Sequence, residues 1–182
     1  IDLDAALAGV AACEGAPGRL ERVAAPEGMQ VFVDYAHTPQ AVAAVLRTLR
    51  QTMSTDARLI VVLGAGGERD RGKRPGMGAA ATLADVAVLT SDNPRNEDPQ
   101  TILEQVAAGA REALASMPGS ARELILELDR RRAIERAIER AGPSDVIVIA
   151  GKGHETTQQI GERSISFDDR RVAAEILAGG LA

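Results

Sequence analysis

The sequence predicts an α/β fold: a Rossmann-like, doubly wound, mostly parallel sheet with a small hairpin at its edge. Short β-branched runs alternate along the chain with Ala-rich stretches of helical spacing. Strands that alternate with helices indicate a parallel sheet covered by helices on both faces. The length of 182 residues suits one well-buried domain, and an aromatic content of 2% leaves the core to Ala, Val, Leu and Ile.

The first segment, residues 2–13, is predicted to be a helix. Asp2 is a plausible N-cap, and Leu3, Leu7 and Val10 fall on one face at helical spacing. A stretch rich in Gly and Pro follows over residues 15–28, and it is the best candidate for a domain boundary.

Five β-branched runs then predict strands, which lie at residues 30–34, 58–63, 85–90, 122–128 and 145–150. Thr38 as N-cap and Pro39 at the first helical position open a helix after the first of these strands. Three further helices are predicted at residues 100–116, 129–141 and 169–178. Weaker alternation around a glycine predicts the edge hairpin at residues 157–166.

Composition excludes several classes of function. The net charge of -5 argues against a nucleic-acid surface, which needs a basic face. Cys13 is the only cysteine, so an intrachain disulfide and a thiolate zinc cluster are excluded, and a reducing cytoplasm fits. The two histidines, His37 and His154, fall in separate loops, so no metal site is expected. No apolar run is long enough to cross a membrane, and because the chain begins with Ile1 and not Met, a fragment or a trimmed sequence is expected.

Four polar loops rich in Gly or Pro follow predicted strands, at residues 34–39, 64–75, 91–99 and 151–156. In an open α/β sheet, ligands bind beyond the carboxyl ends of the strands. A ligand site where these loops meet is therefore expected.

The charged loop GERDRGKR, residues 67–74, permits several interpretations. It matches the spacing of a phosphate loop, but Arg74 occupies the position of the Ser or Thr that reaches magnesium. A dinucleotide turn is disfavoured because its third glycine falls on Arg69. The segment is otherwise a solvated loop, or an anion-binding loop in which Arg69, Arg71, Lys73 or Arg74 meets a carboxylate or phosphate.

Two further loops carry charge. The string DNPR at residues 92–95 forms either an Asx-turn or a site in which Arg95 presents its planar fork to a carboxylate. In GKGHE, residues 151–155, the glycines let the backbone approach a ligand, and Glu155 supplies an anion for an ammonium group. His154 by itself is better explained as a packed or hydrogen-bonded histidine.

The loop after the first predicted strand has two interpretations as well. Asp34 and His37 either belong to the capping arrangement of the helix opened at Thr38, or Asp34 accepts hydrogen bonds from a ribose with His37 nearby. Together with the arginines and Glu155, these loops could bind a molecule of both charges, and amino acids are such molecules.

The motifs taken together resemble the Mur ligase family, in the branch that adds meso-diaminopimelate. The matching strings occur in the order GRLE (18–21), VDYAHTP (33–39), GAGGERDRGKRPGMG (64–78), DNPR (92–95) and AGKGHE (150–155). The resemblance implies that residues 17–182 form the C-terminal Mur ligase domain, which binds the amino acid. Residues 1–16 resemble the tail of the central ATP-binding domain.

The resemblance also implies a reaction. ATP phosphorylates UDP-N-acetylmuramoyl-L-alanyl-D-glutamate, and the amine of meso-diaminopimelate attacks the acyl phosphate to form an amide in peptidoglycan precursor synthesis. It assigns meso-diaminopimelate binding to Arg69, Asp92, Asn93, Pro94, Arg95, Gly151 and Glu155. It assigns the ATP side to Arg19, Asp34, His37 and Lys73, and it places no catalytic residue and no metal ligand in this chain. ATP and Mg²⁺ would be held mainly by the central domain.

Two alternatives remain open beside this expectation. A non-catalytic module of the same fold could bind an amino acid or nucleotide, although the intact DNPR and GKGHE strings favour the ligase. A folylpolyglutamate-type ligase is disfavoured by DNPR. The G-T-x-G-K-T phosphate loop of the family is absent from these residues, so the chain alone is expected to be inactive.

Overall fold

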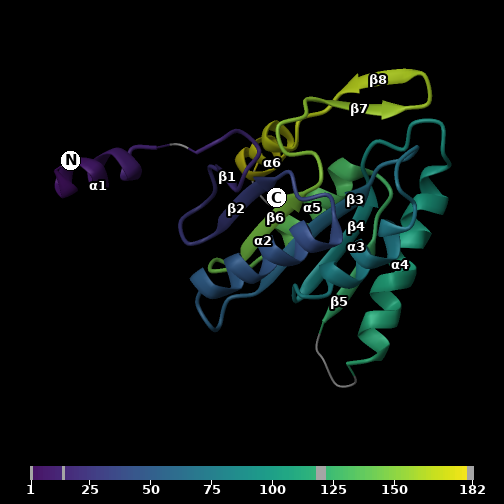
Figure 1. The fold of residues 1–182 in the computed structure, drawn as a ribbon, viewed down its shortest axis with the longest axis horizontal. Coiled ribbons are helices and arrows are strands. Elements are labelled where there is room, and N and C mark those ends of the chain that lie inside the picture. The colour runs from purple at the N-terminus through teal and green to yellow at the C-terminus, as the bar shows by residue number, and fades with distance from the viewer. Residues whose placement is uncertain (1, 14, 118–121, 180–182) are drawn as a thin grey trace.

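A computed structural model describes residues 2–13, 15–117 and 122–179. Its strands are β1 (Glu21–Val23), β2 (Gln30–Asp34), β3 (Leu59–Ala65), β4 (Val86–Ser91), β5 (Glu123–Leu126), β6 (Val146–Ala150), β7 (Thr157–Ile160) and β8 (Arg163–Ser166). Its helices are α1 (Leu3–Ala11), α2 (Pro39–Thr52), α3 (Lys73–Ala81), α4 (Pro99–Ala115), α5 (Arg130–Arg140) and α6 (Asp169–Ala178) (Figure 1).

The predicted fold class is confirmed. Six strands form one sheet in the order β1-β2-β6-β3-β4-β5, and every pairing is parallel except that of β1 with β2. The edge hairpin is confirmed as a separate antiparallel pair of β7 and β8. The five predicted strands are β2 to β6. The sequence analysis missed β1, because three residues with only Val23 buried are too short to show a period.

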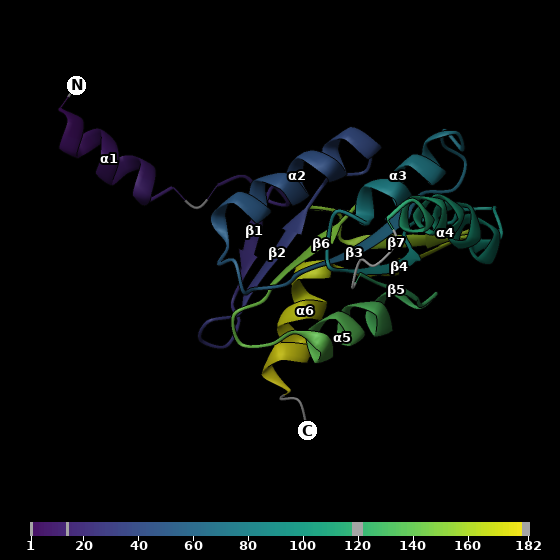
Figure 2. The same cartoon turned by 90° about the horizontal axis from the view of Figure 1, so that it is seen from below.

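Helices cover both faces of the sheet: α2, α3 and α4 lie on one side, and α5 and α6 on the other (Figure 2). The central strand β3 is buried on both faces, so alternate side chains enter different cores. Leu59, Val61 and Leu63 pack with the first group of helices. Ile60 and Val62 pack with the second group.

Helix starts follow the capping rules. Thr38 accepts a hydrogen bond from the Ala41 amide and Pro39 is the first residue of α2, as the sequence predicts. Aspartates at 98, 129 and 168 cap α4, α5 and α6 in the same way.

Helix α3 corrects the sequence analysis, which treated residues 64–75 as one loop. The helix starts at Lys73, has no side-chain cap at Gly72, and contains Pro75 in its first turn. Its glycines and proline are weak helix formers, so propensity alone does not reveal it. Close packing against α4 stabilises it, and Met77 and Ala81 on its inner face are buried.

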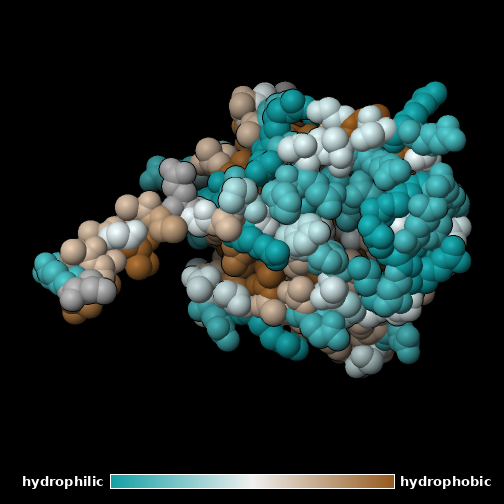
Figure 3. Space-filling view, turned by 45° about the horizontal axis from the view of Figure 1, so that its top comes forward, coloured by the Kyte–Doolittle hydropathy of each residue, from teal (hydrophilic) through white to brown (hydrophobic). Residues whose placement is uncertain are grey.

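The predicted first helix is confirmed as α1, capped by Asp2. It stands away from the rest of the molecule (Figure 1). Its apolar residues are exposed, with 70% for Leu3, 59% for Leu7 and 75% for Val10, and Figure 3 shows this apolar surface on the projecting arm. In the part of the chain that the structure describes, no helix is long and apolar enough to cross a membrane.

Candidate functional site

The carboxyl ends of four neighbouring strands, β2, β6, β3 and β4, surround a cavity of about 160 Å³. These are the strands whose loops the sequence analysis singled out. The lining residues are Tyr35, His37, Gly66, Arg69, Lys73, Asp92, Asn93, Arg95, Gly151 and Glu155. A site at this edge agrees with the general position of ligands in open α/β sheets.

The cavity has both signs of charge. Arg69, Lys73 and Arg95 supply cations, and Asp92 and Glu155 supply carboxylates. Pockets for drug-sized ligands usually measure roughly 300–1,000 Å³, so this volume suits a molecule of amino-acid size. Such a cavity can hold the ammonium of an amino acid beside one wall and its carboxylate beside another.

Arg95 is held at the cavity by its backbone. Its amide donates to the Gln159 carbonyl at 3.1 Å, and its carbonyl accepts from the Gly161 amide at 2.7 Å, so the β7–β8 hairpin supports it. Its φ of 52° lies in the left-handed region, which is uncommon for a residue with a side chain and costs energy. Its Nη1 donates to the Gly67 carbonyl at 2.7 Å, which aims the guanidinium across the loop after β3.

Lys152 is a buried hub that the sequence analysis did not select. Its fully buried ammonium donates to Asn93 Oδ1 at 3.3 Å, to Glu155 Oε2 at 3.2 Å and to the Thr157 carbonyl at 2.6 Å. Asn93 Nδ2 donates to the same oxygen of Glu155 at 2.8 Å. Burial raises the pKa of Glu155, but these partners outweigh burial and keep that pKa below its ordinary value. A lysine between two glycines after a buried strand is the signal that could have found it.

Asp92 is buried and has little compensation. In the described part of the chain its Oδ1 has no hydrogen-bond partner, and the Lys152 ammonium lies 3.8 Å from it. Burial therefore raises the pKa of Asp92, while the charges of Arg130 and Lys152 oppose the rise. Gly151, with a φ of 115°, passes so close that a Cβ there would lie 2.9 Å from Asp92 Oδ2. The glycine is required at this point both by its conformation and by the carboxyl group.

The basic residues of the segment after β3 fall into two groups, those paired with Glu97 and those that line the cavity. Arg74, a candidate anion ligand in the sequence analysis, is fully buried and bonded to both oxygens of Glu97, to Gln105 and to the Gly66 carbonyl. We assign it a structural role, because it is buried away from the cavity and both of its terminal nitrogens already donate to these partners. The hydrogen bond from Arg74 is the largest cause that lowers the pKa of Glu97 to about 2.

Two cations of this loop do reach the cavity. Arg69 is exposed at its rim, and no ion pair to it is present among the described residues. Lys73 also lines the cavity, but its ammonium donates to the His37 carbonyl at 2.8 Å. Arg71 instead pairs with Glu97 at 3.2 Å. The segment thus brings the positive charges of Arg69 and Lys73 to the cavity, while Arg71 and Arg74 are paired with Glu97.

The residues expected to face ATP are arranged around Tyr35. Both carboxylate oxygens of Asp34 accept backbone hydrogen bonds, from Ala36 and from Leu20, each at 2.8 Å. This carboxylate ties the GRLE loop to the end of β2, and the α2 cap is Thr38. The Arg19 guanidinium lies 4.9 Å from the centre of the Tyr35 ring.

Histidines flank the same tyrosine. His37 Nδ1 lies 2.7 Å from the Tyr35 carbonyl, and the two rings meet edge to face at 4.6 Å. Since the carbonyl only accepts, Nδ1 carries the hydrogen and Nε2 is left for another partner. His154 is exposed, with its ring centre 5.5 Å from that of Tyr35. Of the four residues expected on the ATP side, His37 and Lys73 line the cavity.

Pro94 lies apart from the other expected ligands. It lines a larger, mainly apolar groove of about 560 Å³ together with Ile160 and Phe167, and it does not line the charged cavity. We place the site in the smaller cavity because the loops after four parallel strands meet there, where ligands of open α/β sheets bind, whereas the exposed surface of the groove is mainly apolar. The contribution of Pro94 in this geometry is to shape the turn before Arg95.

The described residues contain no group of three or more His, Cys, Asp and Glu side chains that could hold a metal ion.

The fold and the site define an α/β domain with a small cavity lined by side chains of both charges at the carboxyl ends of its parallel strands. Residues 18–153 match the family model described as Mur ligase, glutamate ligase domain, and the chain therefore belongs to the Mur ligase family. The chain is 50% identical over 164 residues to the UDP-N-acetylmuramoyl-L-alanyl-D-glutamate--2,6-diaminopimelate ligase of Lawsonia intracellularis, covering 90% of the chain and 32% of that protein.

Two further relatives agree. The ligase of the same name from Streptomyces avermitilis is 49% identical over 178 residues, covering 97% of the chain and 34% of that protein. A solved structure of a ligase of this name superposes with a TM-score of 0.76 and 41% identity, covering 98% of the chain and 35% of that structure. The chain thus spans about a third of the length of these relatives.

Proposed function

We propose that this chain is the amino-acid-binding, C-terminal domain of an ATP-dependent ligase that adds meso-diaminopimelate to UDP-N-acetylmuramoyl-L-alanyl-D-glutamate. The observation that carries the proposal is the charged cavity, which is lined by Arg95 and by the carboxylates of Asp92 and Glu155. Meso-diaminopimelate has two ammonium and two carboxylate groups, so it matches a cavity with several charges of each sign.

Within this proposal, Arg95 is the partner of the carboxylate that lysine lacks. A guanidinium presents two parallel donors to a carboxylate, and a lysine side chain would leave them unmatched. Glu155 and Asp92 accept from an ammonium group, while Arg69 at the rim pairs with another carboxylate. Asn93 and Gly151 support the ligand by shape and hydrogen bonding, and Pro94 acts through the turn.

Residues 1–16 belong in this proposal to the central ATP-binding domain, and residues 17–182 form the C-terminal domain. The exposed apolar face of α1 supports this division, because such a face is normally covered. Arg19, Asp34, His37 and Lys73 would meet ATP from this side, with its phosphates and Mg²⁺ held elsewhere in the protein. We expect the enzyme to act in the cytoplasm, where ATP is available.

The test is a steady-state assay of the full-length ligase with meso-diaminopimelate and L-lysine as competing acceptors. Product with meso-diaminopimelate and very little with lysine is expected, because one unmatched charged contact already disfavours a substrate strongly. The isolated chain, tested in parallel, should release no phosphate from ATP. Equal kcat/KM for the two amino acids, or binding without any ligation by the full-length protein, would support a non-catalytic or differently selective module instead.

A further inference from the structure

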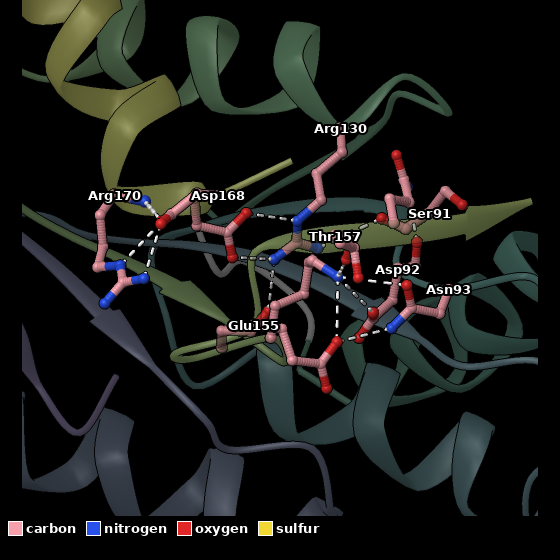
Figure 4. A network of polar contacts seen from close by, with 12 residues as sticks. Ser91, Asp92, Asn93, Arg130, Glu155, Thr157, Asp168 and Arg170 are labelled. Carbon is pink, nitrogen blue, oxygen red and sulfur yellow. Dashed lines mark hydrogen bonds and ion pairs between the residues drawn. The ribbon is translucent and has the colours of Figure 1, made fainter. Parts of the chain in front are cut away.

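A buried ion pair of two residues that do not line the cavity lies close to it. Arg130, the first residue of α5, donates from Nε and Nη2 to both oxygens of Asp169, the first residue of α6, at 2.8 and 2.7 Å. Both side chains are 0% exposed. Figure 4 shows the fork of Arg130 between the start of α6 and the ends of the strands.

The remaining donors of Arg130 reach two strand ends. Nη1 donates to the Ser91 carbonyl at 3.3 Å, and Nη2 donates to the Ala150 carbonyl at 3.1 Å. Ser91 is the last residue of β4, and Ala150 is the last residue of β6. The next residues along the chain, Asp92 and Gly151, line the cavity.

The strands that Arg130 joins are not neighbours, because β3 lies between β4 and β6 in the sheet. The ladders pair Ala150 with Leu63 and Ser91 with Ala65, so no ladder connects the two ends directly. The Arg130 guanidinium thus joins the two strand ends from which the DNPR and GKGHE loops leave the sheet, and the hydrogen bonds of Lys152 and Asn93 join the loops themselves. The field of Arg130 also reaches the cavity, since its charge is the largest influence opposing the raised pKa of Asp92.

The start of α6, where Asp169 lies, is held in place by further ion pairs and hydrogen bonds. The neighbouring Arg170 pairs with Asp168 at 2.7 Å and with Glu21 at 3.3 Å, and Glu21 accepts from the Gly18 amide at 2.7 Å. The start of α6 is therefore tied to the GRLE loop, and Arg130 is anchored to a fixed point.

We propose that Arg130 is a positioning residue that, anchored by Asp169, holds the two amino-acid-binding loops at the spacing required by the substrate. The inference rests on the proposed function. A purely stabilising role explains the pair poorly, because a buried ion pair is often no better for stability than apolar side chains of similar volume. Small displacements of a binding group, by contrast, reduce catalytic efficiency strongly.

The experiment uses the full-length ligase and measures kcat and the KM values for meso-diaminopimelate and ATP, together with thermal unfolding. The main variant is the double change Arg130→Met with Asp169→Leu, which removes both charges of the buried pair together. It should fold, with a Tm near that of the wild type, and raise the KM for meso-diaminopimelate on the order of ten- to a hundredfold. The KM for ATP should change less than about threefold, because no carbonyl on the ATP side loses a donor.

Arg130→Lys is the second variant. It keeps the charge beside Asp169 but not the fork that reaches both carbonyls, so a smaller rise in the same KM is expected. Arg58→Met is the matched control, because Arg58 also pairs with a buried aspartate, Asp145, and also donates to a backbone carbonyl, that of Arg140. These contacts lie at the amino ends of β3 and β6, away from the cavity. The control variant should leave the KM for meso-diaminopimelate unchanged.

A folded double variant with a wild-type KM for meso-diaminopimelate would overturn the inference. If the double variant does not fold, Arg130→Lys decides in the same way, and a wild-type KM in that variant overturns it. Failure of the proposed function is separate, because it would appear as no use of meso-diaminopimelate by the wild-type enzyme.

Discussion

At the scale of single residues, burial divides the arginines near the strand ends into two groups. Arg69 and Arg95 line the cavity, whereas Arg74 and Arg130 are fully buried and donate to carboxylates and carbonyls. The sequence alone does not distinguish these arginines, because all four stand near a strand end or a helix start.

Arg95→Ala in the full-length ligase tests the binding arginine. We expect kcat/KM for meso-diaminopimelate to fall on the order of thirty- to a thousandfold, or about 2–4 kcal/mol, since a carboxylate loses its charged partner. The KM for ATP and the Tm should stay close to those of the wild type. Arg47→Ala, a change at an exposed arginine of α2, is the control and should do neither. A wild-type kcat/KM for Arg95→Ala would mean that DNPR is only a turn.

Asp92→Asn tests the buried carboxyl group that lacks a hydrogen-bond partner at Oδ1 in the described residues. Because burial raises the folded-state pKa of Asp92, the folded protein binds the proton more tightly than the unfolded chain, and stability falls as the pH rises above 3.8 toward that raised pKa. The Asn variant lacks this loss. Its Tm should therefore exceed that of the wild type at pH 8 by a few degrees, given about 2–4 °C per kcal/mol for a domain of this size.

The difference in Tm between Asp92→Asn and the wild type should become smaller as the pH falls from 8 toward 3.8. Thermal unfolding of the chain across this pH range measures this difference. The same change should weaken use of meso-diaminopimelate, since an anion facing the ammonium is lost. Asp56→Asn, at an exposed position, is the control and should show no such trend. A lower Tm for Asp92→Asn at pH 8 would show that Lys152 and Arg130 compensate the carboxylate fully.

At the scale of elements, packing determines what the sequence pattern leaves unspecified. The long apolar runs predict β3, β4 and β6 well, because strands buried on both faces contain almost only apolar residues. Helix α3 escapes prediction because its stability comes from α4. A Cβ at Gly78 would overlap the Val106 carbonyl, and one at Gly109 would overlap the Pro75 carbonyl, so the two helices meet backbone to backbone.

Gly109→Ala tests this contact. The added methyl group meets backbone, which moves only if the helices separate, so we expect a loss of about 1–3 kcal/mol in the free energy of unfolding. Gly9→Ala, in α1, is the matched control because a Cβ there meets nothing within 4 Å. It should leave the unfolding of the sheet unchanged, because α1 stands away from the sheet. The only gain expected is in α1 itself, since Ala favours a helix over Gly by roughly 0.5–1 kcal/mol. Equal melting curves for Gly109→Ala and the wild type in chemical denaturation would contradict the close packing.

At the scale of the whole molecule, the sheet order brings four separate loops to one cavity. The sequence predicts that these loops share one edge, because parallel strands end on the same side. It does not predict which strands are neighbours, so the placement of β6 between β2 and β3 comes only from the structure. The contact of Lys152 with Asn93 and that of Arg130 with Asp169 are not predicted for the same reason. The two residues of each contact are 39 or more positions apart in the sequence.

The most direct test of the proposed binding site is a nitrogen–proton NMR titration of the purified chain with meso-diaminopimelate and, separately, with L-lysine. The account predicts saturable shifts of backbone amides at Gly66, Asn93, Gly151 and Glu155, and weaker effects of lysine at the same positions. The signals of amides at the amino ends of the strands, such as those of Arg58 and Asp145, should not shift. Shifts confined to the apolar groove around Ile160 and Phe167, or identical responses to the two amino acids, would contradict it.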